Sequence, residues 1–156
     1  MEEKRIYKIS IESTPQNQGE IFIDNFLTHC AYDFKPTDAY IMIDKVFGIR
    51  NNIDVMSLNI HCNGLKDVYA QYDGDTNLKN SHSLDIIPAV QIRNVANANI
   101  TNAYFNILNQ LDNWRHISIN ELNNLHISVY GLDAGFPNGV DFNLFIVLKI
   151  KLLRKN

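Results

Sequence analysis

Apolar and polar residues alternate with a period of two along most of this 156-residue chain. Neighbouring residues of an extended strand point to opposite faces of a sheet, so this period is typical of strands with one buried face. Eight runs carry the pattern: 5–12, 20–28, 39–47, 55–62, 66–72, 83–93, 124–131 and 141–153. The segments between the runs are rich in Gly, Pro, Asn and Asp, which favour turns. The sequence therefore predicts an all-β fold, either a two-sheet sandwich or a small barrel.

The last run, residues 141–153, is apolar on both of its faces. Its even positions from Phe142 to Ile150 form one apolar row, which we expect to face the core. Phe145 and Val147, at odd positions, then need a second cover, either residues 95–113 or a neighbouring subunit. The connection before this run is longer than the roughly two residues of a tight hairpin, which favours a crossing between two sheets and hence a sandwich.

One segment follows a different period. From Ile100 to Leu111, apolar residues recur at helical spacing, and Thr101 suits an N-cap. We therefore predict a short helix near 101–111. An ordered loop is the alternative, because Asn-rich segments form poor helices.

The bulk composition narrows the class of protein. Hydrophobic residues make up 46% and charged residues 20%, which is typical of a globular domain. The length fits one domain over residues 1–156. The net charge of -3 argues against a free-standing nucleic-acid binder. Only Cys30 and Cys62 are present, so we expect no disulfide framework and a reducing compartment. No stretch predicts a signal peptide or a membrane span.

Two motifs suggest metal ligands, and both are incomplete. Residues 73–77 carry carboxylate and amide side chains at alternate positions, as a calcium loop does, but Leu78 and Leu84 stand where an EF-hand needs Gly and Glu. An Asp/Gly turn is the preferred interpretation and a looser calcium site the alternative. The dipeptides His29-Cys30 and His61-Cys62 lack the spacing of zinc ligands. We expect Cys62 to be a core residue.

No motif for a nucleophile elbow, a phosphate-binding loop or a zinc hydrolase is present. We therefore assign no catalytic, metal or cofactor-binding residue and do not expect an enzyme. The C-terminal residues 149–156 concentrate basic side chains. A solvated strand end is the preferred interpretation of this tail, and contact with nucleic acid or an acidic partner is the alternative.

The C-terminal pattern resembles a known family. The segment NWRHISINELNNLHISVYGLDAGFPNGVDFNLFIVLKI, residues 113–150, is similar to the closing part of single jelly-roll capsid proteins of virophages, polinton-like viruses and large DNA viruses. It combines Trp114, an alternating strand, Asp133 and Gly135 in a loop, and a final alternating strand. Residues 56–90 carry a second similar stretch, which includes SLDIIP. The resemblance covers about the last two-thirds of the chain.

The resemblance implies an eight-stranded jelly-roll sandwich. Such a fold has two four-stranded sheets with strand orders B-I-D-G and C-H-E-F. Taken in chain order, the internal strands would be 39–47, 55–62, 124–131 and 141–153. The edge strands would include 66–72, which is short and polar, and 83–93, which contains Pro88, as edges allow.

The resemblance also implies a function. The chain would be a minor capsid or penton component that associates with itself, as a pentamer or trimer, and packs against other capsid proteins. It would reside in the virion, assembled in the host cytoplasm or nucleus. Tyr130, Phe145 and Val147 are the candidate interface residues.

The alternative is a β-sandwich module that binds carbohydrate or a receptor. Four aromatic residues in or near loops could serve such a module: Tyr69, Tyr72, Trp114 and Phe136. Binding of nucleic acid is not expected in either case.

Overall fold

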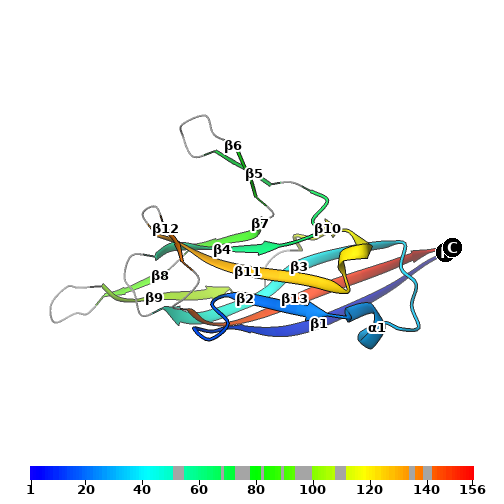
Figure 1. The fold of residues 1–156 in the computed structure, drawn as a ribbon, viewed down its shortest axis with the longest axis horizontal. Helices are drawn as coiled ribbons and strands as arrows, with labels where there is room; N and C mark the ends of the chain where they lie inside the picture. Colours follow the sequence, from blue (N-terminus) through cyan, green and yellow to red (C-terminus); the bar gives the residue numbers. More distant parts are fainter. Residues whose placement is uncertain are drawn as a thin grey trace.

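The computed structural model describes residues 1–50, 55–67, 69–72, 78–81, 83–88, 90–93, 100–107, 112–133, 136–138 and 142–156. These residues form an all-β sandwich of two antiparallel sheets (Figure 1). The first sheet has the order β1 (Glu2–Ser13), β13 (Phe142–Lys155), β3 (Asp38–Arg50), β9 (Ile100–Ile107), β8 (Val90–Arg93), and β10 (Arg115–Ile117) also pairs with β3.

The second sheet contains the remaining long strands. Its order is β12 (Phe136–Asn138), β11 (Asn124–Asp133), β4 (Val55–Cys62), β7 (Ser83–Pro88), and β2 (Glu20–Asp24) also pairs with β11. A separate hairpin joins β5 (Tyr69–Tyr72) and β6 (Leu78–Ser81). Two short helical turns complete the described chain, α1 (Phe26–Cys30) and the 3₁₀ turn η1 (Ile119–Glu121).

Strand β13 lies inside the first sheet. It is hydrogen-bonded to β1 along one edge, from Leu144 to Lys155, and to β3 along the other. Its even positions from Leu144 to Leu152 are buried in the core, while the odd positions from Phe145 to Lys151 are half-buried on the opposite face. The predicted orientation of this strand is therefore confirmed for every position whose side chain is described.

The core fills the space between the sheets. The side chains on the inner faces are buried in one cluster, to which β3 contributes Ile41, Ile43 and Val46. Helix α1 inserts Phe26 at one end, where its ring meets the edge of Tyr7 with 5.4 Å between the ring centroids. Burying one large aliphatic side chain contributes roughly 1.5–3 kcal/mol, so this cluster supplies most of the driving force for folding.

The predicted helix near 101–111 is wrong. Residues Ile100–Ile107 form β9, which pairs with β3 from Val46 to Arg50 and with β8 on its other side. Thr101, Tyr104 and Phe105 are strand-forming residues, and the ladder that β3 offers at its edge outweighs a weak helical period. Residues 108–111 lie outside the described part.

Two expected edge strands are also placed differently. The run 66–72 belongs to neither large sheet, since Tyr69–Tyr72 pairs only with β6 within the described chain. The run 83–93 is divided: β7 pairs with β4 in the second sheet, and β8 pairs with β9 in the first. The run 20–28 ends earlier than expected, because Asn25 takes a left-handed conformation before α1.

The two faces of β13 should differ in their contribution to stability. We predict that Leu148→Ala lowers the free energy of unfolding by about 2–5 kcal/mol, because it leaves a cavity in a fully buried site. The neighbouring Val147→Ala, on the half-buried outer face, should cost less than about 1 kcal/mol. Urea denaturation measures both. Equal losses would contradict the assigned faces.

Candidate functional site

The outer face of the first sheet carries an aromatic pair. Phe145 of β13 and Phe47 of β3 are direct cross-strand partners, and their ring centroids lie 4.9 Å apart. Phe47 remains 42% exposed and Phe145 is half-buried. The described part of the segment 95–113 includes β9, which lies beside β3 in the same sheet. The contact with Phe47 covers part of Phe145, and the Phe47 ring remains open to solvent.

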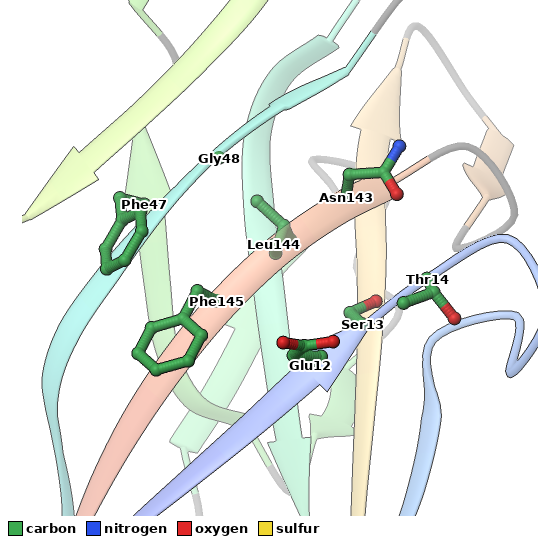
Figure 2. A pocket seen from close by; sticks show the side chains of 8 residues that line it. All are labelled: Glu12, Ser13, Thr14, Phe47, Gly48, Asn143, Leu144 and Phe145. Carbon is green, nitrogen blue, oxygen red and sulfur yellow. The ribbon is translucent and has the colours of Figure 1, made fainter.

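A pocket of about 370 Å³ adjoins this pair (Figure 2). Its wall includes one cross-strand row of Glu12, Phe145 and Phe47. The next row contains Gly48, where β3 approaches β13 so closely that an added Cβ would lie 2.1 Å from the Asn143 carbonyl oxygen. Most of the exposed surface of the pocket is apolar, while Ser13, Thr14, Asn143 and the Glu12 carboxylate supply its polar groups.

The middle of the outer face is shaped by a β-bulge. Val147 pairs with Lys45 and Leu148 with Ile43, so Asp44 is an extra residue on β3. The Asp44 carboxylate is buried, and its oxygens lie 3.3 Å from Lys149 Nζ and 3.8 Å from Lys8 Nζ. A buried carboxylate needs such partners, because its desolvation is costly. Beyond Val147, the face thus changes from apolar to charged.

The basic C-terminal residues have partners within the chain. The Lys151 Nζ lies over the rings of Tyr40 and Trp114, at 4.8 and 4.5 Å from their centroids. Arg154 is paired with Glu3, and the Lys155 Nζ lies 3.3 Å from Asp38. These contacts favour the interpretation of the tail as part of the sandwich surface.

The predicted interface residues fall at different places. Phe145 and Val147 both lie on the outer face of the first sheet, Phe145 against the pocket. Tyr130 lies in β11 of the second sheet, opposite Asn59, and its side chain is outside the described part. The sequence reasoning missed Phe47, Gly48 and Glu12. In the sequence, Phe47 is only the last residue of the alternating run 39–47. Its position next to Phe145 becomes apparent once the pairing register of β3 and β13 is known.

The outer face of the second sheet holds a Ser, His and Glu cluster. The Glu20 carboxylate binds His126 Nε2 and accepts a hydrogen bond of 2.8 Å from Ser128 Oγ. Ser128 Oγ lies 3.3 Å from the same Nε2 atom. In a hydrolase triad, the acid binds the ring nitrogen opposite the one that faces the serine. Here both groups meet one nitrogen, so the cluster joins β2 to β11 and does not activate Ser128.

The candidate metal residues are not brought together in the described chain. Cys62 is buried on the core side of β4, as expected, while Cys30 is exposed at the end of α1. Within the described residues, no three His, Cys, Asp or Glu side chains are arranged to hold a metal ion. Residues 73–77, the calcium-loop candidate, lie outside the described part.

The two cysteines should differ sharply in reactivity. Burial raises the pKa of the Cys62 thiol to about 12, so the nucleophilic thiolate is suppressed in the folded protein. We predict that iodoacetamide at pH 8 labels Cys30 and leaves Cys62 unlabelled, whereas both react in urea. Peptide mass spectrometry measures the labelling. Equal labelling of both thiols in the native protein would contradict the burial.

The raised Cys62 pKa also links stability to pH. The folded state favours the neutral thiol, so the stabilisation that this thiol provides is fully present below its ordinary pKa of 9.0. The free energy of unfolding then decreases as the pH rises from 9.0 toward the folded-state pKa of about 12.

Comparisons with known proteins found no match to this chain among family models, curated proteins or solved structures. Among the described residues, no helix has the length and apolar character needed to cross a membrane.

Proposed function

We propose that this chain is a jelly-roll structural protein of a virion, a minor capsid or penton component that associates with itself and with other capsid proteins. It would act by assembly, not by catalysis, in the host cytoplasm or nucleus. The resemblance of residues 56–90 and 113–150 to single jelly-roll capsid proteins suggests the class.

The strand order supports the jelly-roll part of the proposal. In chain order, the eight main strands are β1, β2, β3, β4, β7, β9, β11 and β13, which would be B to I. The first sheet then has the order B-I-D-G, as β1-β13-β3-β9, and the second C-H-E-F, as β2-β11-β4-β7. Only the strands in positions F and G differ from those that the sequence alone predicted.

The observation that carries the assembly part is the aromatic pair of Phe47 and Phe145 beside an apolar pocket. Fold alone does not imply function, so the proposal depends on this surface. Aromatic residues are enriched at the centres of protein interfaces, because they bury a large area with few rotatable bonds. A sandwich that presents two phenylalanines on the outer face of a sheet has a suitable contact for another subunit.

Replacing one ring should weaken self-association. We predict that the wild-type chain forms a concentration-dependent oligomer, a pentamer or trimer, and that Phe47→Asp raises its dissociation constant at least ~tenfold. Multi-angle light scattering measures the mass. Phe22→Asp is the matched control, since Phe22 is 64% exposed on the opposite sheet. A monomer at all concentrations up to about 100 μM would argue strongly against the proposal.

The second candidate function is a carbohydrate- or receptor-binding module, and one observation favours it. Phe22 stacks parallel to His126, with 4.4 Å between the ring centroids, and the Glu20 carboxylate binds the same imidazole. An exposed ring beside polar groups suits a sugar face. Trp114, the earlier candidate, is instead half-buried beneath Lys151. A glycan array with the wild type and Phe22→Ala distinguishes the two functions.

A further inference from the structure

The loop between α1 and β3, residues 31–37, is fixed firmly to the sandwich. Ala31 and Phe34 are buried, and the guanidinium groups of Arg5 and Arg154 lie 4.7 and 5.0 Å from the centroid of the Phe34 ring. Asp33 accepts a hydrogen bond of 2.9 Å from Arg5, which lowers the pKa of that carboxyl group. These contacts anchor the loop to β1 and β13.

At the C-terminal end of this loop, residue 37 is tied to β13. The Thr37 N–H donates to the Leu153 carbonyl oxygen at 2.7 Å, and the Lys155 N–H donates to Thr37 Oγ1 at 3.1 Å. Both anchors of the loop thus belong to the first sheet. A loop fixed in this way loses little further entropy when its outward side chains meet a partner.

Four residues of this loop are exposed: Asp33 and Thr37, whose contacts are given above, and Tyr32 and Lys35. Tyr32 is 81% exposed, and Lys35 is exposed as well. Within the described chain, neither side chain has an ion pair or a ring contact that would occupy it. The loop therefore presents one aromatic ring and one cation on a rigid support, a combination suited to a complementary surface.

The pocket beside Phe47 and Phe145 has the complementary chemistry. An apolar cavity of roughly 150 Å³ holds a benzene ring, and this pocket of about 370 Å³ is open and larger. Glu12 stands at its rim, and no cation of the described chain is paired with its carboxylate. Aromatic rings favour offset or edge contacts with a third ring, and a carboxylate attracts an ammonium group.

The loop and the pocket lie at opposite ends of the sandwich. Arg5, which anchors the loop, is near the start of β1, and Glu12 is near its end (Figure 1). Seven residues of extended strand span roughly 23 Å. A copy therefore does not fill its own pocket. A contact between two different patches is heterologous, and it generates a ring when the rotation closes.

We propose that the loop 31–37 of one copy docks on the Phe47–Phe145 pocket of the next copy, with Tyr32 against the two phenylalanine rings and Lys35 facing Glu12. This inference rests on the proposed self-association and specifies the surfaces that meet. It also fits a cyclic assembly, because every copy carries one loop and one pocket.

Charge reversal at the two partners tests the docking. Lys35→Glu and Glu12→Lys are each expected to raise the dissociation constant of the oligomer at least ~tenfold, because each places like charges together. The double variant, Lys35→Glu with Glu12→Lys, restores the pair and should return to within about threefold of the wild type. Light scattering over a concentration series measures all four proteins.

Matched controls separate a local contact from a general charge effect. Lys66→Glu makes the same charge change at an exposed lysine outside the loop and the pocket, and it should leave the oligomer unchanged. Tyr32→Ala should weaken association, whereas Phe22→Ala should not. Circular dichroism and thermal unfolding check that each variant keeps the fold.

The outcomes distinguish this inference from the proposed function. Wild-type oligomers that Phe47→Asp disrupts, but that Lys35→Glu, Glu12→Lys and Tyr32→Ala leave intact, would overturn the docking and leave self-association standing. Weakening by both single reversals without recovery in the double variant would also overturn it. A wild type that remains monomeric would overturn both.

Discussion

The structure depends on the pairing of β13 along both of its edges. A strand with β1 on one side and β3 on the other has no free backbone groups along the ladder, so it can be apolar without inviting further strands. Its inner row from Leu144 to Leu152 is completely buried and joins the two sheets through one core. The same constraint fixes the outer row, because each residue next to a buried one must point away from the core. Phe145 and Val147 thus reach the outer face as a direct consequence of the register.

The sequence was most informative where burial is one-sided and strands are long. The alternation in 39–47, 55–62, 124–131 and 141–153 correctly predicted four strands that lie inside sheets. It was least informative between residues 66 and 111, where strands are short and the pattern does not specify a partner. Ile100–Ile107 has a weak helical period, and its pairing with β3 and β8 gives it a strand conformation. The assignment of 83–93 to one strand failed because periodicity carries no information about a change of sheet.

The candidate site could be predicted only in part. Phe145 and Val147 followed from the alternation, but their surroundings depend on long-range contacts. Phe47 becomes the neighbour of Phe145 only through the register that the bulge at Asp44 sets, since one extra residue on β3 shifts all later pairs. Gly48 is a second case, because its need for a residue without a side chain arises from the approach of Asn143, a residue almost a hundred positions away in the sequence. Such constraints become visible only when strands are placed side by side.

The outer face of the first sheet divides into two parts with different capacities for recognition. In the charged part, Lys8 and Lys149 neutralise Asp44, and Lys151 lies over Tyr40 and Trp114. A partner that met these groups would have to compete with contacts already formed and would lose the energy of breaking them. In the apolar part, Phe47 is still 42% exposed and the pocket is open. Burial of an exposed ring gains free energy without breaking an existing pair, since it removes apolar surface from water. Attachment of a further protein surface to this sheet is therefore favoured at the pocket end, where β1, β13 and β3 meet, and is disfavoured along the lysine-rich remainder.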